Sequence, residues 1–290
     1  MTSFTFFENS SLAPHCSMKA GGNAKYICIP SSIGELSAVI AYMRDKNEKL
    51  IVLGNASNIL FSDEGFDGAV IFTSKINDIN TDGCIVTAAC GAALSSVAVF
   101  AAKHSLSGLE FAYGIPGTVG GGVFMNAGAY CGELCDCFKE AVCLTPDLRE
   151  IVLTKEDMSF SYRKSVLSDN GYILLKAAFE LKKGNYDEIK TKMDTCICLR
   201  KEKQPLEYPS CGSTFKRPVG NYAGALIEQC GLKGSSIGGA AVSEKHAGFI
   251  INKDNATAND IIKLIDYVSE LVYEKTGVRL EPEVRIIREK

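Results

Sequence analysis

The stretch from Gly114 to Tyr130, GIPGTVGGGVFMNAGAY, constrains what this chain can fold into more than any other. Its many glycines disfavour a regular packed element, because glycine loses more backbone freedom on folding than any other residue. They also give the backbone access to positive φ and let a ligand approach the peptide N–H groups. The stretch therefore predicts a ligand-binding loop, and its glycines are Gly114, Gly117, Gly120, Gly121, Gly122 and Gly128.

This loop is also uncharged, since no charged residue occurs between Glu110 and Glu133. An anion bound here would be held by backbone dipoles, as phosphates are beside glycine. A flexible linker is the alternative, but linkers favour serine, proline and charge over Ile115, Val119 and Phe124. Neither the Rossmann nor the P-loop pattern fits the stretch. We interpret it as a site for the diphosphate of a cofactor.

A second loop of small polar residues follows the apolar segment Leu50–Leu53, which we expect to be a buried strand. As a turn alone this loop would be ordinary, because asparagine, glycine and serine dominate turns. It precedes the glycine-rich loop by about sixty residues, and two uncharged loops suit an extended ligand such as a dinucleotide. Its residues are Gly54, Asn55, Ala56, Ser57 and Asn58.

The composition is that of an ordinary globular protein with a sizeable core. The chain has 290 residues, 46% of them hydrophobic, which indicates two or three domains. Its net charge of -3 provides no basic field for nucleic acid or anionic lipid. The uncharged span Gly83–Ala102 reads as a strand and then a helix, and the N-terminus MTSFTFFENS has no signal-peptide pattern. We expect no transmembrane segment and a cytoplasmic protein.

The twelve cysteines raise the alternative of a metal site or disulfides, above all Cys131, Cys135, Cys137, Cys196 and Cys198. There is no Cys-x-x-Cys, and the three histidines are distant in sequence. A cytosolic protein keeps its thiols reduced. We therefore expect no metal and predict that these cysteines are small buried residues.

Local signals predict several elements. Ser32 with Glu35 forms a capping-box pattern before an amphipathic helix, and Pro146 lies at the turn of a hairpin. A long helix is expected over Ala258–Thr276, ended by Gly277. For His246 we expect a structural hydrogen bond.

The order of motifs resembles the UDP-N-acetylenolpyruvoylglucosamine reductases, also called UDP-N-acetylmuramate dehydrogenases, over nearly the whole chain. That family carries Leu-Gly-x-Gly-Ser-Asn, which Leu53–Asn58 matches except that Ala56 replaces a glycine, and then the glycine-rich loop. The alanine predicts φ below zero at this position, or else a cost of about 1 kcal/mol for a left-handed backbone.

The resemblance implies an α+β fold. A two-lobed FAD-binding domain of the PCMH or vanillyl-alcohol-oxidase type, with lobes at 1–74 and 75–183, would be followed by a C-terminal α/β substrate-binding domain at 184–290. FAD would lie between the two lobes. The last strand, which bears Glu283, could dock back on the FAD-binding domain.

The resemblance also implies the catalytic residues. Arg163 lies in the family's Tyr-Arg-x-Ser motif, Ser213 in its Pro-x-x-Gly-Ser-x-Phe-Lys motif, and Glu283 is the second carboxylate of the last strand. Without the resemblance, Arg163 could close a surface ion pair and Glu283 could be a solvated strand residue. Substrate binding is expected from Tyr162, Lys216 and Arg217, although a solvated basic face is the alternative for the last two.

The implied activity is the NADPH-dependent reduction of the enolpyruvyl ether of a UDP-sugar in peptidoglycan precursor synthesis. Hydride passes from NADPH to non-covalent FAD and from flavin N5 to C3, and a proton is added at C2. We expect a monomer that binds small molecules and no membrane or nucleic acid. The expected cofactor-binding residues are Gly54, Asn55, Ala56, Ser57, Asn58, Gly114, Ile115, Pro116, Gly117, Thr118, Gly120, Gly121, Asn126 and Ala127.

Two other functions stay open at this stage. One is a different flavin enzyme of the same cofactor fold, such as a sugar or hydroxy-acid oxidase, and the other is a non-catalytic nucleotide-binding module. The identity of the proton donor is also open, because Cys211 stands two residues before Ser213. Intrinsic acidity favours the thiol. With Gly212 between them, however, we expect the two side chains to point to different sides of the loop.

Overall fold

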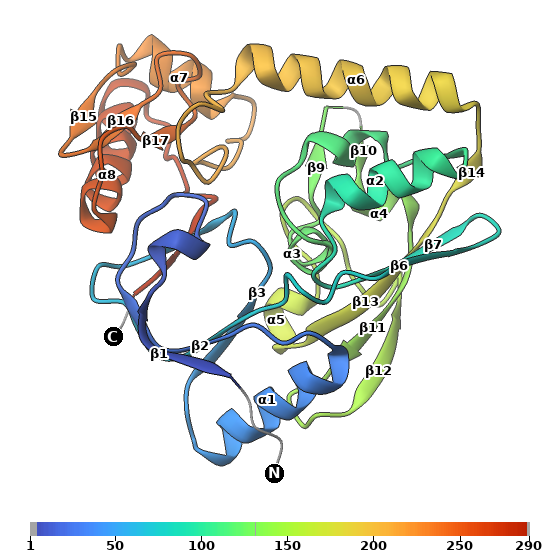
Figure 1. The fold of residues 1–290 in the computed structure, drawn as a ribbon. Coiled ribbons are helices and arrows are strands. Elements are labelled where there is room, and N and C mark those ends of the chain that lie inside the picture. The colour runs from blue at the N-terminus through green and yellow to red at the C-terminus, as the bar shows by residue number, and fades with distance from the viewer. Residues whose placement is uncertain (1–4, 131, 289–290) are drawn as a thin grey trace. The chain divides into compact units, whose positions relative to one another are not determined.

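The computed structural model describes residues 5–130 and 132–288 (Figure 1). The chain divides into two compact units, each built from separate stretches of sequence. Unit 1 comprises Met1–Phe6, Ile27–Asn55 and Ala69–Arg200, and unit 2 comprises Phe7–Tyr26, Ala56–Gly68 and Lys201–Lys290. The division at 74 and 183 expected from the sequence stays a prediction.

Unit 1 contains an antiparallel five-stranded sheet in the order β12-β11-β13-β7-β6. The hairpin expected around Pro146 is confirmed, because β11 pairs with β12 from Glu140↔Thr154 to Leu144↔Glu150. The strands are β6 (Ile79–Asp82), β7 (Ile85–Ala89), β11 (Phe138–Leu144), β12 (Glu150–Thr154) and β13 (Ile173–Glu180).

Helix α1 of this unit begins where its local capping signal predicts. In α1 the Ser32 hydroxyl accepts a hydrogen bond from Glu35 N at 3.1 Å, while the Glu35 carboxylate accepts from Ser31 N at 2.7 Å. Two short ladders, β8/β14 and β9/β10, join loops beside the helices. The elements are α1 (Ile33–Asp45), α2 (Leu94–Lys103), β8 (Leu106–Ser107), η2 (Glu110–Gly114), α3 (Val119–Phe124), β9 (Gly128–Ala129), β10 (Gly132–Glu133), α4 (Leu134–Cys137), α5 (Leu167–Asn170), β14 (Lys182–Lys183) and α6 (Tyr186–Lys203), whose last three residues belong to unit 2.

The glycine-rich stretch is partly helical, so the prediction of an irregular loop is wrong for Val119–Phe124. A Cβ on Gly122 would lie 3.0 Å from side-chain atoms of Leu94 and Leu134, and one on Gly120 would lie 3.1 Å from a backbone oxygen. These glycines are therefore needed so that α3 can pack closely against its neighbours.

A four-stranded sheet has the order β1-β2-β5-β3, and the boundaries between the units fall inside β1, β2 and β5. Its strands are β1 (Phe6–Ser11), β2 (Asn23–Cys28), β3 (Leu50–Leu53) and β5 (Phe66–Phe72). Strand β3 pairs with β5 in parallel, from Leu50↔Ala69 to Leu53↔Phe72. All four residues of β3 are half-buried, so the expectation of a buried strand is wrong in that respect.

Unit 2 packs helix α8 against the antiparallel sheet β15-β16-β17 (Figure 1). The expected ends of α8 are confirmed: Thr257 and Asp260 form a capping box, and Gly277 is left-handed at φ 73°. Strand β18 pairs in parallel with β4, from Arg285↔Ile59 to Ile287↔Phe61. The elements are η1 (Ala13–His15), β4 (Ile59–Phe61), α7 (Ala223–Gln229), β15 (Ser236–Ile237), β16 (Ala240–Val242), β17 (Ile250–Asn252), α8 (Ala258–Thr276) and β18 (Arg285–Ile287).

Within the described residues, every helix is too short or too polar to cross a membrane.

Candidate active site

Gly54 of the first uncharged loop and Thr118 of the second approach each other within unit 1. A Cβ on Gly54 would lie 2.0 Å from Thr118 Oγ1, so only glycine allows this approach. Thr118 is 1% exposed and caps α3, because its hydroxyl accepts a hydrogen bond from Gly121 N at 3.5 Å. The structure thus joins two segments that are about sixty residues apart in the chain.

Two N–H groups of these loops, both in unit 1, are available to a ligand. Among the residues that the structure describes, the N–H groups of exposed Asn55 and half-buried Gly117 donate no hydrogen bond. Gly121 is exposed, and a Cβ on it would meet only Thr118 Oγ1, at 3.9 Å. Uncommitted N–H groups on an uncharged loop match the needs of a diphosphate. The residues present therefore fit the diphosphate of FAD.

Ala56 has a left-handed backbone with φ 44°, so the expectation of φ below zero is wrong. The residue is 4% exposed, and its carbonyl accepts a hydrogen bond from Ser17 N at 3.4 Å. A left-handed alanine costs about 1 kcal/mol or more relative to a right-handed one. The loop thus keeps the conformation that glycine favours, although this chain has a side chain there.

Arg163 is presented by a tight turn in unit 1. Ser161 N donates to Lys164 O at 3.0 Å and Lys164 N donates to Ser161 O at 3.2 Å, which closes the turn. Arg163 itself is left-handed at φ 56°. Its Nη2 donates to Gly128 O at 3.4 Å, and its guanidinium carbon lies 5.0 Å from the centre of the Tyr162 ring. The arginine is half-buried, while Tyr162 is 51% exposed.

Ser213 and Glu283 lie on adjacent antiparallel segments of unit 2. Phe215 and Pro282 form a bridge, and Glu283 N donates to Thr214 O at 2.8 Å. The Glu283 carbonyl also accepts a hydrogen bond from Asn58 Nδ2 at 3.1 Å. Ser213 is exposed and Glu283 is half-buried. The structure therefore brings together two of the expected catalytic residues and one residue of the first loop.

Cys211 and Ser213 lie on different sides of their loop, as expected. Cys211 is 6% exposed, and its thiol donates to Ile59 O at 3.4 Å. Burial is the main cause that raises the pKa of the Cys211 thiol to about 12. Ser213 is exposed, and Gly212 between the two residues is left-handed at φ 76°. The greater intrinsic acidity of a thiol is thus lost at this position.

The two basic residues expected to bind substrate differ in their surroundings. Lys216 Nζ lies 3.2 Å from a carboxylate oxygen of Glu281, and both side chains are largely exposed. The guanidinium carbon of Arg217 lies 4.7 Å from the centre of the Tyr222 ring, and Tyr222 is 64% exposed. A guanidinium is attracted to the face of an aromatic ring, and the same group also binds phosphates.

Arg200 on α6 is a candidate ligand-binding residue that we did not predict. Its Cδ lies 3.5 Å from where a Cβ on Gly114 would be, and burial lowers the pKa of its guanidinium, an effect that Tyr130 opposes. In the part of the chain that the structure describes, no carboxylate pairs with it. Position 200 continues the apolar stripe of α6 that runs through Ile189 and Met193. A cation on that stripe is the sequence signal that could have revealed it.

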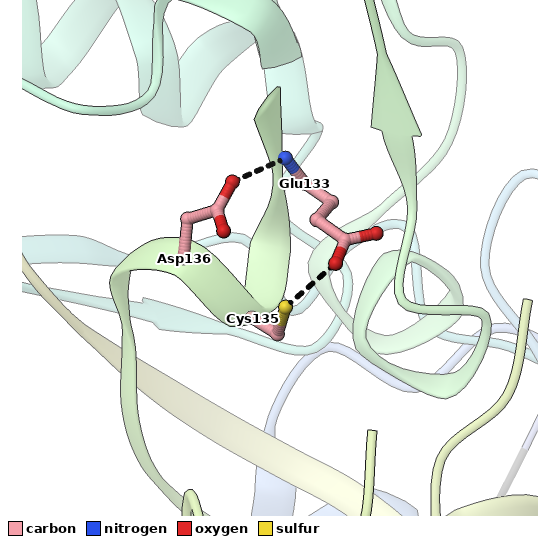
Figure 2. A group of neighbouring side chains, drawn as sticks. All are labelled: Glu133, Cys135 and Asp136. Atoms are coloured by element: carbon pink, nitrogen blue, oxygen red, sulfur yellow. Dashed lines mark hydrogen bonds between the residues drawn. The ribbon is translucent and has the colours of Figure 1, made fainter. Parts of the chain in front are cut away.

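Three side chains at the start of α4, those of Glu133, Cys135 and Asp136, gather closely enough to invite a metal-site interpretation (Figure 2). The Asp136 carboxylate accepts from Glu133 N at 2.9 Å, and the Glu133 carboxylate accepts from the Cys135 thiol at 2.9 Å. Burial is the largest cause that raises the pKa of the Cys135 thiol to about 11, so it stays neutral at neutral pH. The group is a helix capping box, and its hydrogen bonds account for the clustering.

The other cysteines that the structure describes form no disulfide, and most are buried. The prediction of buried residues is wrong for Cys198, which is exposed, and for Cys135, which is half-buried. Cys131, which the sequence analysis singled out, lies outside the described residues. Burial raises the pKa of Cys137 and of Cys143 to about 12. His246 makes the structural hydrogen bond expected of it, because its Nδ1 accepts from Gly248 N at 3.1 Å.

Comparison with known families defines the class of the protein first. Residues 24–152 match an FAD binding domain, and residues 204–287 match the C-terminal domain of UDP-N-acetylenolpyruvoylglucosamine reductase. The chain is thus an FAD-binding oxidoreductase, and its α+β fold class is the expected one.

Whole-chain relatives then give the family. The chain is 48% identical to the UDP-N-acetylenolpyruvoylglucosamine reductase of Caldanaerobacter subterraneus, over 98% of this chain and 94% of that protein. It is 49% identical to the reductase of Caldicellulosiruptor bescii, over 98% and 91%. The crystal structure of the reductase from Thermus caldophilus superposes with a TM-score of 0.85 at 33% identity, over 98% and 99%. This chain belongs to the UDP-N-acetylenolpyruvoylglucosamine reductase family.

Proposed function

We propose that this protein reduces UDP-N-acetylglucosamine enolpyruvate to UDP-N-acetylmuramate in peptidoglycan precursor synthesis, with NADPH as the hydride donor. Non-covalently bound FAD would accept hydride from NADPH and deliver it from N5 to C3 of the enolpyruvyl ether. A proton added at C2 completes the reduction of the carbon–carbon double bond. The protein's own residues bind the reactants, stabilise the developing charge and supply the proton.

Arg163 stabilises the negative charge that develops when hydride adds at C3. That addition pushes charge through C2 into the substrate carboxylate, and a fixed cation there lowers the barrier. The closed turn that presents Arg163 and the contact of its Nη2 with Gly128 O at 3.4 Å support this role, because they hold the guanidinium in place. Tyr162, which lies beside it, contributes to substrate binding.

Ser213 donates the proton to C2, and Glu283 assists through a water molecule. A serine hydroxyl is a weak acid, so it can donate only to a strongly basic carbon and with hydrogen bonds from its neighbours. Ser213 is exposed to reactants, whereas Cys211 is buried and has a raised pKa. Arg217, with Lys216, would bind the diphosphate of the UDP-sugar, since guanidinium groups bind phosphates in bidentate fashion.

One observation carries the proposal: exposed Ser213 and half-buried Glu283 lie on neighbouring segments of a chain that also contains an FAD-binding domain. The relatives named as this reductase cover nearly the whole chain, which supports the same conclusion. The expected cofactor loops contain no cysteine or histidine, which supports non-covalent binding.

The test is a spectrum followed by kinetics. The purified protein should show flavin absorbance, and acid precipitation should release the colour into the supernatant and leave a colourless pellet. NADPH oxidation under anaerobic conditions should then require the UDP-enolpyruvyl sugar and yield UDP-N-acetylmuramate. A yellow pellet would contradict non-covalent binding. NADPH oxidation that depends on oxygen but not on the UDP-sugar would support an oxidase, and a colourless, inert protein would support a binding module.

A further inference from the structure

We propose that Asn126 is a positioning residue for Arg163 and not a side-chain ligand of the cofactor. Its side chain joins the end of the glycine-rich loop to the turn that presents the arginine, and both lie in unit 1. This inference rests on the proposed function, since that function is what makes Arg163 catalytic.

The Asn126 side chain is buried and each end of its amide has a hydrogen-bond partner in the protein. The residue is 1% exposed, Nδ2 donates to Ser161 O at 3.3 Å, and Oδ1 accepts from Cys135 N at 3.0 Å. These partners fix the orientation of the amide, because a carbonyl requires a donor and an N–H requires an acceptor. The protein therefore sets the orientation of this buried amide at both ends, without any bond to a cofactor.

The contact between Asn126 and Ser161 acts on the backbone that carries Arg163. Ser161 is the first residue of the closed turn 161–164, in which Ser161 and Lys164 exchange two hydrogen bonds. The Ser161 carbonyl therefore has two donors, Lys164 N and Asn126 Nδ2. Loss of Asn126 would remove the hydrogen bond between the turn and the glycine-rich loop, so the turn would open more readily.

The glycine-rich loop also contacts the guanidinium group of Arg163. Gly128, whose carbonyl accepts from Arg163 Nη2 at 3.4 Å, lies two residues after Asn126. Gly128 itself is fixed by the pairing of β9 with β10, in register Glu133↔Gly128. A shift of the turn relative to this loop would therefore break the guanidinium contact as well.

Backbone conformation explains why asparagine suits this position. Asn126 is left-handed at φ 41°, and Arg163 is left-handed at φ 56°. Asparagine tolerates this region better than most residues, whereas arginine is held there only by its surroundings. Two further contacts hold the segment that contains the turn: Ser165 Oγ donates to Phe124 O at 2.9 Å, and Val166 N donates to Met158 O at 2.8 Å.

The experiment is a double-mutant cycle on the holoenzyme with Asn126→Gly and Arg163→Ala. Glycine accepts the left-handed backbone, so the variant removes the side-chain hydrogen bonds without adding strain. Flavin reduction by NADPH and reoxidation by the UDP-enolpyruvyl sugar are measured separately by rapid mixing. The Asn126→Gly variant should slow reoxidation about 10- to 100-fold, the size expected for a small misplacement of a catalytic group. Flavin reduction and the FAD dissociation constant should stay near wild type.

The double-mutant cycle shows whether Asn126 affects flavin reoxidation through Arg163. If Asn126 acts through Arg163, Asn126→Gly should have little further effect on reoxidation once Arg163 is alanine. Multiplicative losses in the double variant would overturn the proposal, as would unchanged reoxidation in the single variant. A weakened FAD affinity with slowed flavin reduction would also overturn it and restore the role of cofactor ligand.

Two matched controls separate positioning from loss of stability. Asn255 is an exposed left-handed asparagine with φ 49°, so Asn255→Gly repeats the backbone change and removes an exposed hydrogen bond, from Nδ2 to Asp254 Oδ1 at 3.3 Å. Asn252 in unit 2 is 7% exposed and also bridges two backbone groups, with Nδ2 3.0 Å from Met18 O and Oδ1 2.7 Å from Ala256 N. Asn252→Ala thus removes a similar pair of hydrogen bonds. Neither control should show coupling to Arg163→Ala.

A readout without substrate keeps this inference separate from the proposed function. If the wild-type protein fails to convert the UDP-sugar, the proposed function fails, while amide hydrogen exchange still tests the contact. The Lys164 N–H, which bonds Ser161 O at 3.2 Å, should exchange faster in Asn126→Gly and not in Asn255→Gly. Unchanged exchange in Asn126→Gly would show that Asn126 does not hold the turn.

Discussion

At the scale of single residues, Arg163 gives the sharpest prediction. Arg163→Ala should lower the rate of flavin reoxidation by the UDP-enolpyruvyl sugar by about 10²–10³, the usual effect of removing one stabiliser of a developing oxyanion. FAD content should stay normal, because Arg163 contacts Gly128 O and the Tyr162 ring, which lie outside the segments 54–58 and 117–121 expected to hold the cofactor diphosphate. Rapid mixing of the reduced enzyme with substrate measures this rate. Loss of FAD from the variant would show that Arg163 is structural.

Ser213 and Cys211 make a matched pair for identifying the proton donor. Ser213→Ala should leave flavin reduction by NADPH intact and abolish reoxidation by substrate. Cys211→Ala should keep nearly wild-type turnover and lose some stability, because the thiol fills a core position at 6% exposure. Both half-reactions and a urea unfolding curve are measured for each variant. If Cys211→Ala blocks reoxidation and Ser213→Ala does not, the thiol is the donor.

The lowered pKa of the His246 imidazole predicts how the stability of the protein depends on pH. Burial is the main cause that lowers the pKa of its imidazole below 6.5, and Nδ1 accepts a hydrogen bond that protonation would remove. Since the folded pKa lies below the unfolded one, the unfolded state binds the proton more tightly. This contribution to stability is therefore complete above about pH 6.5 and is lost as the pH falls below it.

Comparing wild type with the His246→Asn variant isolates the contribution of His246 to the pH dependence of stability. Asparagine Oδ1 can still accept from Gly248 N but does not titrate. The free energy of unfolding in urea should fall more in wild type than in the variant between about pH 7.5 and about pH 5.5. Equal decreases would contradict the assignment.

At the scale of elements, the same glycine-to-alanine change should have opposite effects in two helices. Gly277 ends α8 at φ 73°, where alanine has to adopt a left-handed backbone, so Gly277→Ala should destabilise the protein by about 1 kcal/mol. Gly34 lies inside α1, and a Cβ on it would meet only Ser32 Oγ, at 4.0 Å. Gly34→Ala should stabilise by up to about 1 kcal/mol. Urea unfolding measures both changes, and changes of equal sign would contradict the argument.

Element ends were predictable where the signal is local. The capping box of Thr257 with Asp260, the glycine after α8 and the turn at Pro146 each act within a few residues of the boundary that they set. Helix α3 was not predictable in this way. Its glycines look like loop residues in sequence, and their packing against Leu94 and Leu134 depends on other segments. The half-burial of β3 likewise depends on what surrounds the strand, which its four apolar residues do not encode.

In the candidate site, too, some features could be predicted from local sequence and others depend on distant segments. The motifs of Arg163, Ser213 and Glu283 were visible in the sequence through the family resemblance. The engagement of the Asn126 amide was not, because its partner Ser161 is 35 residues away. Arg200 was missed for a similar reason, since only the fold brings α6 next to Gly114.

At the scale of the whole molecule, long-range pairing decides which parts of the chain form a unit. The core around α8 includes Met18, Ala20 and Leu60 together with residues from 211 onward. Strand β18 pairs with β4, which lies more than two hundred residues earlier in the chain, from Arg285↔Ile59 onward. These contacts belong to unit 2, whose sequence is discontinuous. Local patterns in 201–290 contain no information about these partners.

This arrangement predicts that residues 201–290 do not fold when expressed alone. The fragment would lack β4 and the side chains of Met18 and Leu60, each at most 1% exposed in the intact chain, so part of its core would be open to water. Its amide NMR spectrum should be poorly dispersed and its hydrogen exchange fast. Addition of a separately expressed fragment 1–200, which supplies Phe7–Tyr26 and Ala56–Gly68, should restore dispersed resonances. A dispersed, cooperative spectrum from the isolated fragment would mean that the early segments only cover a core that folds without them.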